Sequence, residues 1–277
     1  LLPSIFSSGI TQINILIGTI IASYEAGAVS YLYYADRIYQ INLAIAGIAV
    51  GTVSLPALSK AFKNKNIKKL SNIQSKSFEL SLLLSIPASL GLILASEEIV
   101  NSLFGYGSFS EKDVKLTADA LKYFGYGVPA FALVKILSNF FFARDNTKTP
   151  LYISIFMVII NISISVSLFA SYGFIIIPIA TSISTWIGVL IYIYLLNEKN
   201  SLLLNKKLIP NFIKILASTI IMSIIMVLLI NNYESYLNYS YKFKAIYLLS
   251  IVGFVGIVYL LSCYLFGILK LKNYKTN

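Results

Sequence analysis

Two adjacent charges, Asp36 and Arg37, lie in the segment YLYYADRIYQ (31–40), which otherwise has the composition of a membrane helix. Neighbouring residues of a helix point in different directions, so these two side chains do not form an ion pair with each other. The planar guanidinium of arginine donates paired hydrogen bonds that match the oxygens of a phosphate. Arg37 therefore indicates non-covalent binding of an anion.

A stripe of polar or small residues runs through Arg37 at helical spacing. Ionisable groups at membrane depth cost about 2.5–3.5 kcal/mol each on insertion scales, so they normally face protein or water. The stripe either lines a cavity or packs closely on another helix, and Gly47 and Gly51 fit the close-packing pattern. We favour an anion contact in a cavity over a buried ion pair between two helices. The stripe consists of Tyr33, Arg37, Gln40, Ala44, Gly47 and Gly51.

The residue types that most enzymes need are scarce in this chain. It has no histidine and one cysteine, Cys263, which excludes a disulfide framework and disfavours a His- or Cys-based metal centre or catalytic triad. A membrane glycosyltransferase would need a carboxylate cluster in a loop, and the candidates alternate with lysines without metal-ligand spacing. We expect a solvated loop there and no enzyme activity. These candidates are Glu97, Glu98, Glu111, Asp113 and Asp119.

The elements that must position these residues are membrane helices. Of the 277 residues, 57% are hydrophobic and 12% are charged, values typical of an integral membrane protein. Segments of about 20 apolar residues are long enough to cross a bilayer. We therefore predict an all-α polytopic membrane protein with about eight transmembrane helices. They cover residues 3–23, 29–57, 77–96, 117–142, 151–171, 174–196, 211–231 and 244–268.

Basic residues are concentrated in alternate loops, as expected if this count of helices is correct. The loops after the second, fourth and sixth segments and the C-terminal tail hold Lys60, Lys63, Lys65, Lys68, Lys69, Lys76, Arg144, Lys148, Lys199, Lys206, Lys207, Lys214, Lys270, Lys272 and Lys275. The opposite loops hold only Lys112, Lys115, Lys122, Lys242 and Lys244. This bias predicts that both ends of the chain are cytoplasmic. The net charge of +11 thus indicates topology and anionic lipid, and no nucleic-acid partner is expected.

One loop of the opposite side contains the stretch IVNSLFGYGSFS (99–110). Its apolar residues followed by glycines suit a short helix at the membrane interface, and an ordinary loop touching lipid is the alternative.

Several motifs together resemble the MurJ (MviN) family of lipid II flippases, within the MOP transporter superfamily. They are TQIN (11–14), SYLYYADRIYQ (30–40), GIAVGTVSLPALSK (47–60), FGYGSFS (104–110) and FFARDNTKTP (141–150). The resemblance implies a fourteen-helix transporter whose seventh to fourteenth helices correspond to this chain. Residues 1–196 would form the second six-helix lobe, and residues 197–277 two further helices with a basic tail. The start at Leu1 is read as a truncation, so an N-terminal lobe is expected as a missing part or a partner in trans.

The resemblance also implies a function, in which an undecaprenyl-pyrophosphate-linked peptidoglycan precursor (lipid II) moves from the inner to the outer leaflet by alternating access. It implies substrate-binding roles for Arg37, Ser30 and Lys135, with Arg37 meeting the pyrophosphate. It implies gate roles for Asp36, Arg144 and Lys148. One departure is Asn146, where the family usually has an acid; here the acid is Asp145.

The expected location is the bacterial inner membrane, with lipid II and membrane lipids as partners. No cofactor is expected, and the coupling force would be sodium, protons or the membrane potential. A sodium site on Asn14, Asn161 and Thr181 is one hypothesis, and it would have no carboxylate ligand from residues 1–22, which contain no acid. Interhelical hydrogen bonding is the alternative for such polar residues. An exporter of drugs, cations or another lipid-linked oligosaccharide in the same superfamily, and a purely structural role, remain the competing interpretations.

Overall fold

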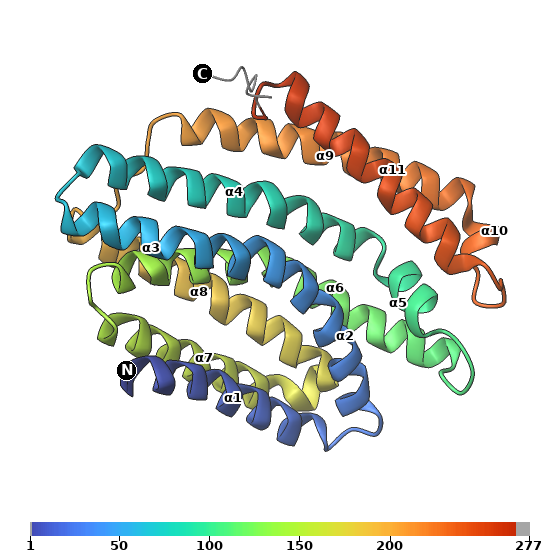
Figure 1. The fold of residues 1–277 in the computed structure, drawn as a ribbon. Helices are drawn as coiled ribbons and strands as arrows, with labels where there is room; N and C mark the ends of the chain where they lie inside the picture. The colour runs from blue at the N-terminus through green and yellow to red at the C-terminus, as the bar shows by residue number, and fades with distance from the viewer. Residues whose placement is uncertain (1, 270–277) are drawn as a thin grey trace.

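The computed structural model describes residues 2–269, and side-chain surroundings from Gln12 onward, so Lys270, Lys272 and Lys275 of the predicted tail lie outside the described residues. These described residues form helices and connections only (Figure 1). The helices are α1 Leu2–Ala22, α2 Ala28–Leu43, the π-helix η1 Ala44–Ala49, α3 Val50–Lys63, α4 Ile67–Leu94, α5 Ser96–Phe104, α6 Glu111–Phe142, α7 Lys148–Tyr172, the 3₁₀-helix η2 Gly173–Ile175, α8 Ile176–Glu198, α9 Leu208–Asn232, α10 Glu234–Leu237 and α11 Lys244–Leu265.

Within these residues, 6 helical runs are long and apolar enough to cross a membrane. The run 28–63 joins α2, η1 and α3, and the run 148–198 holds two helices, α7 and α8, which pack on each other. The described part of α1, Gln12–Ala22, is a further apolar helix. Each predicted membrane segment thus corresponds to a helix or a continuous helical run. The prediction of an all-α polytopic membrane protein is confirmed.

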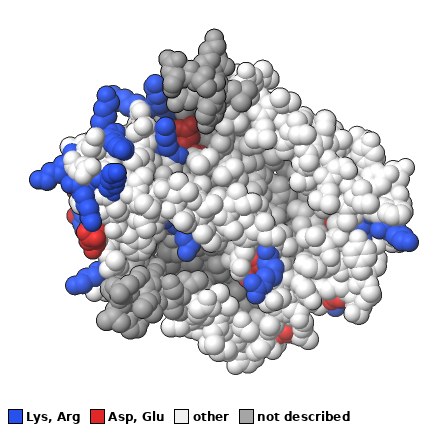
Figure 2. Space-filling view, in the orientation of Figure 1, with Lys and Arg blue, Asp and Glu red and all other residues white. Residues whose placement is uncertain are grey.

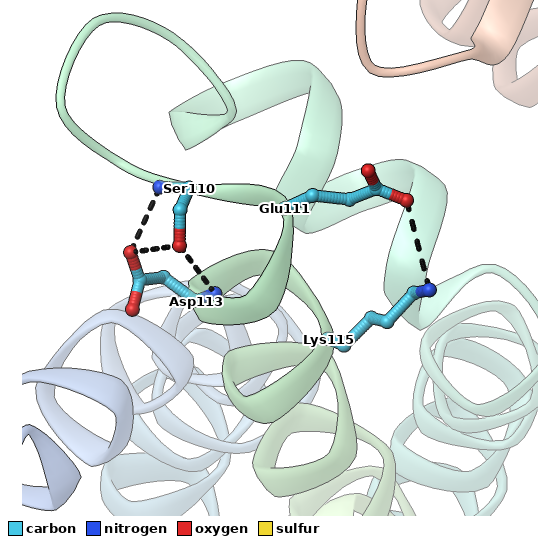
Figure 3. A network of polar contacts seen from close by, with 4 residues as sticks. All are labelled: Ser110, Glu111, Asp113 and Lys115. Carbon is cyan, nitrogen blue, oxygen red and sulfur yellow. Dashed lines mark hydrogen bonds and ion pairs between the residues drawn. The ribbon is translucent and has the colours of Figure 1, made fainter.

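Two helices begin well before the predicted membrane segments at 77 and 117. Helix α4 begins at Ile67 because the side chain of Asn66 accepts a hydrogen bond from the backbone N–H of Lys69 at 2.9 Å. Helix α6 begins at Glu111 with a capping box between Ser110 and Asp113 (Figure 3). Apolar length marks the lipid-embedded part of a helix, whereas capping residues determine where the helix starts.

Helix α6 is the centre of the bundle, and 72% of the residues in its most apolar stretch are buried. It packs on α2, α3, α4, α5 and α8. Helices α1, α7 and α8 lie on one side of the bundle, and α9 and α11 lie on the other side against α4 (Figure 1). Hydrophobic residues of α9 and α11 share one core with those of α3, α4, α6 and α8. Hydrophobic packing thus continues across residue 196, and the predicted division into a six-helix lobe and two further helices stays a prediction.

The α3–α4, α6–α7 and α8–α9 connections meet at the left end of the bundle in Figure 1. Basic side chains gather on the left of the same view in Figure 2. We call this the basic end of the molecule and the other the opposite end. At the opposite end, the stretch 99–110 contains the second part of α5 and the turn after it, so a short helix is present there, and its location at the membrane interface stays a prediction.

Candidate anion-binding site

One face of the continuous run α2–η1–α3 is uncovered along its length. Ser30 and Arg37 are exposed on it, and large apolar side chains continue it toward the basic end. Their exposed fractions are high: Tyr33 53%, Ile41 62%, Ile45 55%, Ile48 50% and Val53 78%. The face is therefore apolar for most of its length and carries a basic group near one end.

Arg37 makes its closest aromatic contact within its own helix. The guanidinium carbon lies 4.7 Å from the centre of the Tyr33 ring, a cation–π distance. In the described part of the chain, the ion pair found joins Lys115 Nζ and Glu111 Oε1 at 3.6 Å (Figure 3), and none involves Arg37. A buried ion pair of Arg37 with another helix is therefore not found among the described residues, and its role as an anion contact stays a prediction. The guanidinium fork stays available to an external anion.

Asp36 also has its polar contact inside α2. Its half-buried carboxylate accepts a short hydrogen bond from the side-chain amide of Gln40, four residues further along the helix. This differs from the expected contact with another helix or a gate, because Gln40 provides a donor one turn away. A gate role for Asp36 stays a prediction.

The predicted stripe from Tyr33 to Gly51 does not form a single face. Tyr33 and Arg37 are exposed, whereas Gly47 and Gly51 are buried against α6. The π-helix η1 begins at Ala44 and contains Gly47, and its i→i+5 hydrogen bonds add a residue to the turn and rotate the side chains relative to those of α2. Sequence spacing at 3.6 residues per turn misses this change. Such π segments are frequent at functional sites.

Lys135 reaches this run from α6. It is exposed, although its helix is otherwise largely buried, and its Cγ is 3.5 Å from the position of a Cβ built on Gly47. Next to it, Asn139 donates a hydrogen bond of 2.8 Å to the carbonyl of Gly51. The structure thus brings Lys135 to the α2–η1–α3 run, roughly three helical turns from Arg37.

Arg144 lies at the basic end and connects three parts of the chain. It donates hydrogen bonds to the carbonyl of Phe140 and, at 2.8 Å, to the carbonyl of Ser201, and its guanidinium carbon lies 5.5 Å from the ring centre of Phe62. Burial lowers the pKa of the Arg144 guanidinium. These contacts join α3, α6 and the α8–α9 connection.

The α6–α7 connection holds the other predicted gate residue, Lys148, which is exposed at the first position of α7. Asn146, at the position where the family usually has an acid, accepts a hydrogen bond of 3.1 Å from the backbone N–H of Thr149. Its amide also donates to the Thr149 hydroxyl at 2.9 Å. Asn146 therefore caps α7, which an amide does without a charge.

Two of the three residues considered for sodium are adjacent. The Asn161 amide donates to the Thr181 hydroxyl at 3.0 Å, and Ser165 donates to the Asn161 carbonyl oxygen at 3.1 Å. The Thr181 oxygen is thus engaged in a hydrogen bond between α7 and α8, and the Asn161 oxygen in one within α7. The first bond agrees with the interhelical alternative for Asn161. Asn14 is half-buried in α1, with no hydrogen bond to either residue among those described. Sodium binding stays a prediction.

Comparisons with known proteins agree with this arrangement. The sequence model of the family described as Lipid II flippase MurJ matches residues 1–248. A relative described as "Probable lipid II flippase MurJ" from Rickettsia prowazekii (strain Madrid E) is 37% identical over 277 residues, covering 99% of this chain and 54% of that protein. One with the same description from Rhizobium meliloti (strain 1021) is 43% identical over 190 residues, covering 69% of this chain and 36% of that protein.

Solved structures show the same fold. The structure titled "Lipid II flippase MurJ, inward closed conformation" superposes with a TM-score of 0.78 at 26% identity, covering 96% of this chain and 53% of that one. An outward-facing multidrug resistance MATE family transporter of the MOP superfamily gives a TM-score of 0.66 at 14% identity, covering 94% of this chain and 60% of that one, which shows a shared fold alone. The chain spans about half the length of the curated relatives that match nearly all of its residues.

Proposed function

The chain belongs to the lipid II flippase MurJ family, and on that basis we propose that it forms the second half of a flippase. Its substrate would be the undecaprenyl-pyrophosphate-linked precursor of peptidoglycan, moved from the inner to the outer leaflet of the bacterial cytoplasmic membrane. The basic end would face the cytoplasm, in keeping with the bias of basic residues.

The observation that carries this proposal is the uncovered face of α2–η1–α3. A guanidinium on a largely apolar membrane-helix face is costly unless water or an anion reaches it. A polyprenyl pyrophosphate matches the face in both respects, because the pyrophosphate accepts paired hydrogen bonds from Arg37 and the polyprenyl chain suits apolar side chains. Ser30 lies two turns from Arg37 on the same face and would add a hydroxyl donor.

Transport of this kind requires no covalent step. Arg37, together with basic groups of the missing N-terminal half, would neutralise the pyrophosphate during its passage between the leaflets. The membrane potential supplies about 2.3 kcal/mol per charge per 100 mV, so it or an ion gradient is a sufficient driving force. Asp36, Arg144 and Lys148 are proposed gate residues, and Lys135 a second contact for the substrate.

The proposal is tested with a full-length chimera, made by joining this chain to the N-terminal half of the Rickettsia prowazekii relative. The chimera is expected to restore growth to cells depleted of their own flippase, whereas residues 1–277 alone are not, because half a cavity cannot alternate. Arg37→Ala removes a charge-assisted contact worth about 1.5–3 kcal/mol, or about 10- to 150-fold in affinity, and should abolish or strongly reduce rescue. Arg37→Lys should rescue partly.

Lys115→Ala is the matched control, since it removes an exposed basic residue of a surface ion pair at the start of α6. It should rescue like the parent. If both Arg37 variants also rescue like the parent at equal expression, the anion-binding role of Arg37 is wrong.

An exporter of organic cations is the competing function. It would need uncovered carboxylates on the same face, but Asp36 is the only acid among residues 30–56, and its carboxylate is bonded to Gln40. A cation exporter would lose activity in Asp36→Asn and keep it in Arg37→Ala, whereas the proposed flippase should show the greater loss in Arg37→Ala.

A further inference from the structure

Lys244, the first residue of α11, is a buried cation that the proposed transport cycle does not use. Its exposed fraction is 0%, and its ammonium donates to Asn101 Oδ1 at 2.9 Å, to the Gly105 carbonyl at 2.7 Å and to the Tyr239 carbonyl at 2.8 Å. The same nitrogen lies 4.3 Å from the ring centre of Tyr106 and 4.7 Å from that of Tyr239. All three donors of the ammonium are satisfied without a carboxylate partner among the described residues.

These contacts attach the segment before α11 to the α5–α6 connection, residues 105–110. Two further hydrogen bonds join the same parts of the chain. The Asn101 amide donates to the Leu237 carbonyl at 2.8 Å, and the Tyr239 hydroxyl donates to the Phe109 carbonyl at 2.6 Å. Contacts with Lys244 and with the segment before α11 therefore hold the α5–α6 connection in position.

The other side of this connection packs on α2, close to Arg37. The rings of Phe104 and Phe109 lie 4.7 Å and 5.4 Å from the ring of Tyr34. The Tyr34 ring is 5.9 Å from that of Tyr33, over which the Arg37 guanidinium lies. An unbroken series of contacts thus leads from Lys244 through the connection to Arg37.

The start of α6 holds the same end of α2 through a separate bond. The Tyr31 hydroxyl donates to Asp113 Oδ1 at 2.8 Å. Asp113 is also the capping-box residue of α6 (Figure 3), so the turn that follows the connection is itself fixed. The connection and the first turn of α6 together define the position of the N-terminal part of α2, which contains Tyr31 and Tyr34.

We propose that Lys244 is a positioning residue for Arg37, acting through the α5–α6 connection and Tyr34. A lysine suits this place because three oxygens converge on one point, and an ammonium presents three donors to them. Without the ammonium these buried oxygens lose their partner, so the connection must shift to find water or another donor. Its aromatic contacts with Tyr34 would shift with it. The inference rests on the proposed function only in that Arg37 is taken as the anion contact.

The first experiment measures the order of α2 without any ligand. The purified chain, with Cys263→Ala to remove its single cysteine, carries a nitroxide label at Val29→Cys, an exposed position at the start of α2. Lys244→Met is expected to increase the mobility of this label in the electron paramagnetic resonance spectrum. Tyr239→Phe removes only the bond to Phe109 and should have a smaller effect in the same direction, which keeps the test decisive if Lys244→Met folds poorly.

A control label at Ile159→Cys, an exposed position of α7, should give the same spectrum in all variants. Unchanged mobility at position 29 together with a lower melting temperature would overturn the inference, because Lys244 would then only hold the C-terminal segment in place.

The second experiment measures binding of inorganic pyrophosphate to the full-length chimera, because the proposed site also uses basic groups of the N-terminal half. Lys244→Met should weaken binding by about two- to thirtyfold, the range found for residues that act through a contact network. In an Arg37→Ala background it should have no further effect, and an equal loss in both backgrounds would contradict action through Arg37. Failure of the chimera without these substitutions to bind pyrophosphate would count against the proposed function, while the label spectra still decide the positioning role.

Discussion

Arg37 and Lys244 are both basic residues with mostly apolar neighbours in the sequence, but their environments in the folded chain differ. Arg37 is exposed and lies over an aromatic ring of its own helix, whereas Lys244 is fully buried among three oxygens. The first is free to bind an external anion, and the second is already saturated. Arg144 is intermediate, since it is half-buried and donates to the carbonyls of two different segments.

Among the acids outside the membrane segments, Glu98 of α5 has an unusual environment. Burial raises the pKa of its carboxyl above the ordinary value, and the neighbouring charges of Glu97 and Glu234 raise it further. The folded state therefore holds this proton more tightly than the unfolded chain does. Ionised Glu98 opposes folding at neutral pH, and this penalty disappears as the pH falls through the raised pKa toward the unfolded value of about 4.3.

Glu98→Gln removes the ionisation and should raise the melting temperature at pH 7. The gain should shrink as the pH is lowered toward about 4.3, where the parent carboxyl is also neutral when folded. Melting curves of the detergent-solubilised chain between these two pH values measure it. Glu198→Gln, at an exposed position at the end of α8, is the matched control and should change little. A gain that is the same at every pH would contradict the prediction.

Between elements, Gly47 and Gly51 pack closely against α6. A Cβ built on Gly47 would lie 3.1 Å from the Ala132 Cα and 3.0 Å from Leu43 Cδ1. The sequence pattern of small residues correctly predicted close packing at these glycines. Because the contact is with backbone, neither helix accommodates added volume without moving.

Gly47→Ala should therefore lower the free energy of unfolding by about 1–3 kcal/mol, the usual cost of overpacking. Gly91→Ala is the matched control, because nothing lies within 4 Å of a Cβ at this position in α4. It should be neutral or stabilise by up to about 1 kcal/mol, since alanine favours helix. Reversible unfolding in mixed detergent measures both. Equal effects of the two substitutions would show that helix propensity, not packing, determines the result.

For the whole molecule, the α8–α9 connection attaches the C-terminal helices to the helices before residue 199. Gln74 of α4 is fully buried; its amide donates to the Ser201 carbonyl at 3.2 Å, and its oxygen accepts from the Leu203 N–H at 2.8 Å. The Asn205 N–H donates to the Ser75 hydroxyl at 2.7 Å. Arg144 adds its bond to Ser201. The connection is therefore part of the hydrogen bonding of the helices before residue 199.

This arrangement predicts a difference between two truncated chains. A chain ending at residue 196 leaves the Gln74 amide and the Ser75 hydroxyl without these partners, whereas a chain ending at 207 keeps them. With about 0.5–1.5 kcal/mol per hydrogen bond, the longer chain should unfold at a clearly higher temperature. Thermal unfolding in the same detergent compares them. Identical melting temperatures would show that the connection contributes nothing to the stability of the helices before it.

The sequence alone determined the class of protein, the membrane helices and the alternation of basic loops. These properties follow from apolar length and charge counted along a single stretch of chain, so no knowledge of distant residues is needed. It also predicted that Arg37 contacts an anion, from residue type and membrane depth, and this role stays a prediction. The family resemblance added the implied substrate.

Tertiary structure alone decided which of these side chains are free. Periodicity states which residues share a face, but not what covers it. The predicted face is interrupted where α2, with exposed Arg37, passes into the π-helix η1, which contains buried Gly47. The sequence predicted Lys244 to be an ordinary loop lysine. Its partner Asn101 is 143 residues away in the chain, so no local pattern could indicate the contact. A side chain becomes buried through contacts with segments that are distant in the sequence, and only folding brings those segments together.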